Sequence, residues 1–144
     1  MFNPSRDQVR QFFFAVWAKY RAGQPLAGAE QPALDAVLAH PEYHGILDQP
    51  ERYQERDYLP EAGETNPFLH LSMHLAIAEQ LSVDQPPGIR ERYQQLVKLH
   101  GDEMDAQHAI MECLGEMIWQ VQRHQTAFDS AAYLRCLDQQ LNKN

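Results

Sequence analysis

Apolar residues recur at steps of three and four along most of this chain, which is the spacing of one face of an α-helix. The first such stripe predicts a helix that ends near Arg21, and Ser5 and Gln8 match a capping box at its start. The stripe consists of Val9, Phe12, Phe13, Val16, Trp17 and Tyr20. Core packing is the common explanation for such an aromatic stripe.

Further helices are predicted by the same pattern. One begins near Gln31, a second covers Gly88 to His100, a third runs from Asp102 to about His124, and the last begins with Asp129 or Ser130 as its cap. No stretch of the sequence alternates with a period of two. The fold class is therefore all-α, and we expect a compact helical bundle of about five to six helices with a central four-helix-bundle-like core. At 144 residues, the chain suits a single domain, 1–144.

The segment from Asn66 to Gln80 differs from the other helices because it is apolar on almost every side. Asn66 followed by Pro67 predicts a helix start, since Asn caps first-turn N–H groups and Pro fits the first helical position. A helix that is hydrophobic all round is normally buried. His70 and His74 lie four residues apart within it and therefore share a face.

The helical pattern is interrupted at two places, and each interruption has two possible structural interpretations. At His40-Pro41 the proline either kinks the second helix or restarts it with His40 as the cap, and both readings keep His40 within about one turn of His44. Asp48 to Thr65 is polar with several breakers, so it is expected to be irregular, either as a functional lid or as a surface crossover.

The formal charge of -8 disfavours two classes of partner. Without a basic stripe, binding to nucleic acid or to an anionic membrane surface is disfavoured. The sequence shows no export signal and no apolar run long enough to span a membrane, which predicts a cytoplasmic protein. Cys113 and Cys136 have no metal-binding spacing, and we expect them to be reduced and buried.

Three polar pairs stand at the i, i+4 spacing that lets two side chains converge on one ion: His40 with His44, His70 with His74, and His108 with Glu112. The third pair lies on a stripe expected to face inward. That stripe consists of Met104, His108, Met111, Glu112, Gly115, Ile118, Trp119 and Gln122. An ionised glutamate buried there would need a cation or a donor beside it. The six residues are therefore the candidate metal ligands.

Imidazoles with one carboxylate suit a divalent transition metal, with Fe or Zn favoured, and disfavour Mg and Ca. Six ligands would approach a dinuclear site, whereas four suit a single ion. As an enzyme, such a protein would be a small-molecule oxidoreductase or hydrolase; as a carrier or sensor, it would only hold the ion. The sequence leaves open whether it is an enzyme.

The alternative is a metal-free acidic interaction module, in which the same histidines and Glu112 form a structural polar network. This hypothesis predicts an exposed apolar patch, with Trp17 or Phe128 as candidates. The partner would then be a small molecule, another protein or a second copy of this chain.

Four longer stretches of sequence add a family resemblance to the spacing of the candidate ligands. These are HPEYH from His40, NPFLHLSMHLAIAEQ from Asn66, DQPPGIR from Asp84 and HAIMECLGEMIW from His108. Together they cover most of the chain and resemble a family of short bacterial proteins known only as a domain of unknown function. The resemblance implies an all-α fold and a cytoplasmic bacterial origin, and it supplies no activity.

Overall fold

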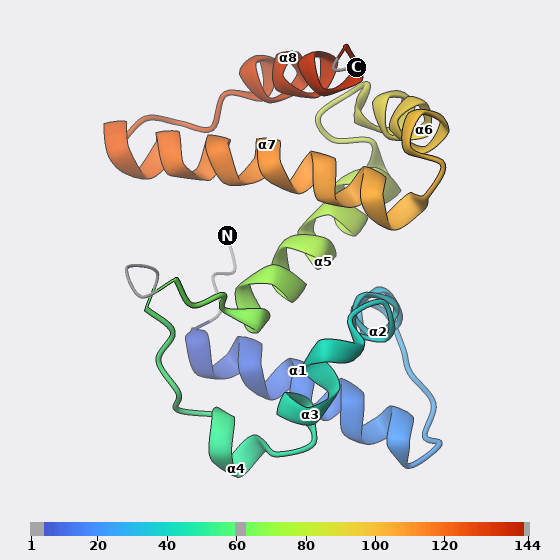
Figure 1. The fold of residues 1–144 in the computed structure, drawn as a ribbon, viewed down its shortest axis with the longest axis vertical. Helices are drawn as coiled ribbons and strands as arrows, with labels where there is room; N and C mark the ends of the chain where they lie inside the picture. The colour runs from blue at the N-terminus through green and yellow to red at the C-terminus, as the bar shows by residue number, and fades with distance from the viewer. Residues whose placement is uncertain (1–4, 60–62, 143–144) are drawn as a thin grey trace. The chain divides into compact units, whose positions relative to one another are not determined.

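All the regular secondary structure is helical in the parts of the chain that the computed structural model describes, residues 5–59 and 63–142 (Figure 1). Its elements, in chain order, are α1 (Arg6–Arg21), α2 (Glu30–Leu38), the 3₁₀-helix η1 (Pro41–Tyr43), α3 (His44–Leu47), α4 (Pro50–Tyr53), α5 (Pro67–Val83), α6 (Ile89–His100), α7 (Glu103–His124) and α8 (Ser130–Leu141). The predicted all-α class is confirmed. None of the described helices is long and apolar enough to cross a membrane.

The expected number of five to six helices is too low, because the described residues form eight α-helices. The difference comes from α3 and α4, which are single turns of four residues each. Pro50 stands at the start of α4, where a proline loses no helical hydrogen bond. The prediction that Asp48 to Thr65 is irregular is therefore wrong over Pro50–Tyr53. One-turn helices are too short to leave a periodic pattern.

The chain divides into two compact units, residues 1–75 and 76–144, with the division inside α5. In the second unit, α6, α7 and α8 pack against one another pairwise. The single domain and the four-helix-bundle-like core stay predictions.

The core of the first unit contains part of the predicted aromatic stripe of α1, whereas Tyr20 of that stripe is 44% exposed. Phe13 and Val16 are fully enclosed, and Trp17 is only 4% exposed while its Nε1–H donates to Asp48 Oδ1 at 2.7 Å. The exposed apolar patch suggested for Trp17 is therefore absent, although Phe128 is 40% exposed. The remaining core residues are Phe14, Ala33, Leu34, Ala36, Val37, Leu47, Phe68 and Leu71.

Arg10 lies in this apolar core and is 2% exposed. Its Nη1 donates to the carbonyl oxygens of Tyr53, Gln54 and Arg56 at 2.7–3.0 Å, and its guanidinium carbon stands 4.7 Å from the centre of the Phe68 ring. Burial lowers the pKa of this guanidinium. Because a buried charge is tolerated only with good partners, the three carbonyls explain how Arg10 can be enclosed, and they fix the chain after α4 against α1.

Helix boundaries follow the predicted capping signals. The Ser5–Gln8 capping box is present, Asn66 Oδ1 accepts from the N–H groups of Phe68 and Leu69, and Asp102 and Asp129 cap α7 and α8. These are local interactions between side chains and the first-turn backbone, so the sequence shows them directly.

The buried face of α7 differs from the predicted stripe. It is formed by Ala106, Ala109, Ile110, Met111, Cys113, Leu114 and Met117. Of the predicted stripe only Met111 is buried, whereas Glu112 is exposed, Ile118 is 37% exposed and Trp119 is 50% exposed. The prediction was wrong because two apolar faces run along this helix, and periodicity alone does not decide which of them meets the core.

Cys113 of α7 and Cys136 of α8 form a disulfide, so the expectation of two reduced thiols is wrong. The packing of α7 against α8 brings their Cα atoms to 5.8 Å, within the range that a disulfide needs. A separation of 23 residues with no recognisable motif gives no hint of that proximity.

Candidate metal centre

The first unit brings three of the six candidate ligands together. Two of them come from α5, which begins at Pro67 behind the Asn66 cap. His70 and His74 follow one turn apart, so both imidazoles leave the same face of the helix. His74 is 2% exposed, and His70 is half-buried.

The third histidine, His40, owes its position to the proline after it. Pro41 disfavours helical backbone at the preceding residue, and His40 accordingly leaves α2 at φ −126°, ψ 70° before η1 begins. The restart reading of this segment is therefore confirmed. The His40 side chain folds back, and its Nδ1 lies 2.7 Å from the carbonyl oxygen of Ala36 in the last turn of α2. That carbonyl is one of those a helix end leaves without an intrahelical donor.

The contact with Ala36 fixes the tautomer of His40. A carbonyl oxygen only accepts, so Nδ1 must carry the proton, and in the neutral ring Nε2 then presents a lone pair. This arrangement, with one ring nitrogen held by a carbonyl and the other left as a base, is the usual one for a metal-binding histidine.

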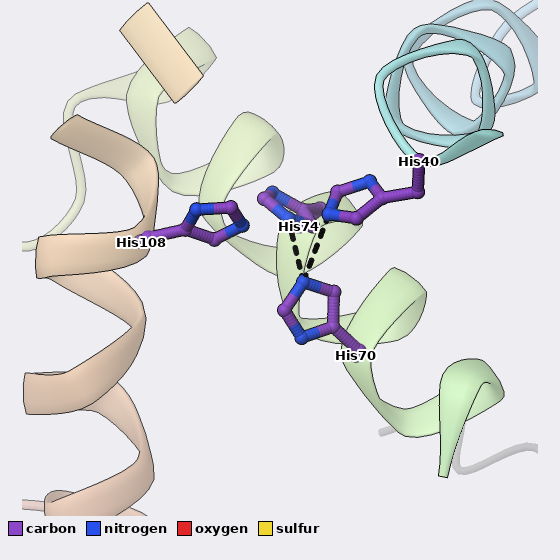
Figure 2. A group of neighbouring side chains, drawn as sticks. All are labelled: His40, His70, His74 and His108. Atoms are coloured by element: carbon purple, nitrogen blue, oxygen red, sulfur yellow. Dashed lines mark hydrogen bonds between the residues drawn. The ribbon is translucent and has the colours of Figure 1, made fainter. Parts of the chain in front are cut away.

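The three Nε2 atoms face a common point (Figure 2). His70 Nε2 lies 3.0 Å from His40 Nε2 and 3.2 Å from His74 Nε2, and all three residues offer ligand atoms within 4.8 Å of one another. Nitrogens bound at about 2.0–2.1 Å to one ion stand about 2.8–3.4 Å apart for octahedral to tetrahedral angles. The two short separations match the edges of such a coordination polyhedron.

These contacts can be made either by hydrogen bonds between the rings or by a shared ion. Because His40 Nε2 is a lone pair, the contact to His70 needs a proton on His70 Nε2. That nitrogen cannot then accept from His74, 3.2 Å away, so a metal-free arrangement needs the one proton shared between the lone pairs of His40 and His74. A cation at the shared point would satisfy all three lone pairs at once.

Tyr43 forms one wall of the histidine cluster, by which we mean His40, His70 and His74. Its ring stacks on His40 with centroids 5.4 Å apart and planes 6° from parallel, and it meets the His70 ring edge-on at 6.0 Å. Burial raises the pKa of the Tyr43 phenol, so the side chain is neutral at neutral pH. The pattern of the sequence did not single out Tyr43, although its place between His40 and His44 was the available signal.

His44 lies outside the histidine cluster. Its Nε2 is 2.8 Å from the carbonyl oxygen of Val37, and its ring packs on Trp17 at 4.4 Å between centroids. His40 and His44 thus bind successive carbonyls at the end of α2, Ala36 and Val37. Two imidazoles four residues apart serve here as C-terminal caps of the preceding helix, and one of them also reaches the cluster.

His108 and Glu112 belong to α7 in the second unit. They line a cavity of about 350 Å³ there, together with His100, Asp105, Ala109 and Gln140. Glu112 is exposed, and its Oε2 accepts from Gln140 Nε2 at 2.9 Å. The expectation that Glu112 is buried is therefore wrong, and the donor that it was expected to need, in place of a cation, is the neutral amide of Gln140 on α8.

Comparison with known proteins supports the resemblance noted from the sequence. Residues 5–139 match the model of a family described as a domain of unknown function, DUF1841. The chain belongs to this family. Neither the curated proteins nor the solved structures include a match. Family membership is therefore shown, whereas the bacterial origin stays a prediction, and the function is left to be argued from the histidine cluster.

Proposed function

We propose that this protein binds one divalent transition metal ion through the Nε2 atoms of His40, His70 and His74. The observation that carries the proposal is the convergence of these atoms, with His70 Nε2 3.0 and 3.2 Å from the other two, while the Ala36 carbonyl holds His40 in the ligating tautomer. An all-imidazole set favours Zn or Fe over Mg and Ca.

We also propose His108 as a fourth ligand, as its place in an i, i+4 pair on α7 suggested. Glu112 and His44 are left out of the ligand set, because Glu112 is exposed with its own amide donor and His44 is held by Val37 and Trp17. A cytoplasmic location and the absence of nucleic-acid and membrane partners stay predictions.

The competing explanation is a metal-free polar network. The same distances would then arise from imidazoles sharing protons, and the cluster would contribute to folding without holding an ion. The two explanations differ in whether the purified protein retains a metal ion.

The test is metal content in the full chain purified without a histidine tag, stripped with chelator, and reloaded with Zn²⁺ or, under anaerobic conditions, Fe²⁺. We expect about one ion per chain after desalting. His74→Ala should lose the ion, while the matched control His124→Ala, at an exposed position at the end of α7, should keep it. Circular dichroism verifies that both variants are helical. Failure of the wild-type chain to retain either metal would establish the polar network instead.

A further inference from the structure

We infer that Tyr43 is a positioning residue of the metal site. Its ring holds the plane of the His40 imidazole before an ion arrives, and this restraint sets how tightly the ion is bound. The inference rests on the proposed metal site, and it goes beyond that proposal because it assigns a role to a side chain outside the ligand set.

The 3₁₀-helix η1 brings the two side chains together. It spans Pro41–Tyr43, and the N–H of Tyr43 donates to the carbonyl oxygen of His40 at 3.0 Å. A 3₁₀-helix has three residues per turn, so side chains three positions apart lie above one another. An α-helix has 3.6 residues per turn and would offset them around its axis. The tight turn that follows His40 therefore sets Tyr43 over the imidazole.

The rings of His40 and Tyr43 form a parallel stack. Their centroids are 5.4 Å apart and their planes are 6° from parallel, which is the offset arrangement that flat rings favour. The Tyr43 ring also meets the His70 ring edge-on, with centroids 6.0 Å apart. Since His40 is only 4% exposed, its imidazole cannot turn out of this plane without pushing against the tyrosine ring.

The stack and the hydrogen bond of His40 restrain different motions. Stacking alone permits two orientations of the imidazole, because a half turn about the Cβ–Cγ bond keeps the ring in the same plane. The Ala36 carbonyl oxygen, 2.7 Å from Nδ1, selects one of them, since a ring carbon would face it in the other. Together, the two contacts direct Nε2 of His40 toward Nε2 of His70, 3.0 Å away.

His40 needs such a restraint more than the other two ligands of the first unit. His70 and His74 belong to α5, whose helical backbone sets them one turn apart on a shared face. His40 instead lies between α2 and η1, with a backbone at φ −126°, ψ 70° that belongs to neither helix. The direction of its imidazole therefore depends on contacts made by the side chain.

A ring that is already oriented binds an ion more tightly, because binding then does not have to order it. Removing a group that orients a metal-bound histidine typically lowers metal affinity by about 10–100-fold. Loss of the aromatic face of Tyr43 should have an effect of this kind, although the proposed ligands themselves would all remain in place.

The experiment compares the full-length wild type with Tyr43→Leu and Tyr43→Phe, each loaded with Co²⁺, whose visible spectrum reports the geometry of its ligands. Competition with a chromophoric chelator gives the affinities. Leucine keeps apolar bulk but has no flat face, so we expect Tyr43→Leu to bind Co²⁺ at least about tenfold more weakly and with a changed spectrum. Phenylalanine keeps the ring, and Tyr43→Phe should bind Co²⁺ as the wild type does.

Tyr53→Leu is the matched control. Tyr53 is also a half-buried tyrosine that packs against the core of the first unit, and its ring lies 5.5 Å from the guanidinium carbon of Arg52. We expect this variant to lose stability in urea, as Tyr43→Leu does, while its affinity for Co²⁺ and its spectrum stay those of the wild type. Should circular dichroism show that Tyr43→Leu is unfolded, Tyr43→Met takes its place, since methionine fills a similar space without a flat face.

Three results would overturn the inference. Wild-type affinity in Tyr43→Leu would show that the stack does not restrain His40. An equal loss in Tyr43→Phe would assign the effect to the hydroxyl group, and an equal loss in Tyr53→Leu would assign it to general stability. In all three cases the wild type retains Co²⁺, so the proposed function stands. If the wild type itself retains no Co²⁺, the proposed function fails and the role of Tyr43 fails with it.

Discussion

The Nε2 atoms of His40 and His70 lie 3.0 Å apart, although the two residues are 30 positions apart in the chain. One stands where Pro41 ends α2, and the other stands in the first turn of α5, behind the Asn66 cap. Two short-range signals, a helix stop and a helix start, thus present two imidazoles that the packing of the first unit then joins.

His40 and His44 should respond differently to the same substitution. We expect His40→Gln to reduce Zn²⁺ affinity by at least about tenfold, because it removes a ligand, whereas His44→Gln should keep one ion per chain, because His44 binds Val37 and Trp17 instead. Competition with a chromophoric chelator measures both affinities. Equal losses in the two variants would mean that the cap contacts, rather than ligation, explain the effect.

Arg10→Lys should destabilise the protein by about 2–3 kcal/mol. Lysine keeps the charge but cannot reach the carbonyls of Tyr53, Gln54 and Arg56 in the same geometry, so a buried cation loses charge-assisted hydrogen bonds. The free energy of unfolding in urea measures the change. Arg52→Lys, at an exposed position on α4, is the matched control and should stay within about 0.5 kcal/mol of the wild type.

Reduction of the Cys113–Cys136 disulfide should lower the free energy of unfolding by about 3 kcal/mol, since the bond closes a loop across a sequence separation of 23. Urea unfolding with and without reductant gives the difference. The Cys113→Ala, Cys136→Ala double variant should show no effect of reductant. Alkylation of the unreduced, unfolded protein should label neither cysteine, and labelling of both would contradict the disulfide.

Asp84 should contribute to stability in a pH-dependent way. Hydrogen bonds from the Arg90 N–H, and also from the Gly88 N–H, hold the pKa of its carboxyl below the usual value. A pKa that is lower in the folded state gives stability that is present above the unfolded value, about 4, and is lost as pH falls through the folded value. The melting temperature of Asp84→Asn should therefore fall less between pH 7 and pH 3 than that of the wild type. Glu51→Gln, at an exposed carboxylate, should retain the wild-type slope.

Much of the molecule follows from local patterns. The capping box at Ser5, the caps at Asn66, Asp102 and Asp129, and the shared face of His70 and His74 depend on residues within one turn of each other. Periodicity likewise identified Phe13 and Trp17 of the aromatic core of α1, but it missed the buried Phe14. Interactions between residues within about one helical turn can be predicted from the sequence alone.

The sequence by itself determined the longer helical segments, where most of them begin, and which side chains share a face, but it gave no sign of the one-turn helix α4. The tertiary structure alone decided which face is buried. It turned Ala106, Ile110 and Leu114 of α7 inward and left Glu112 exposed, paired Cys113 with Cys136, and selected His40 over His44 for the histidine cluster. The physical reason is that the helical repeat fixes only the direction in which each side chain leaves its own helix. Which face then meets another helix depends on the burial of apolar surface and the pairing of polar groups across the whole unit.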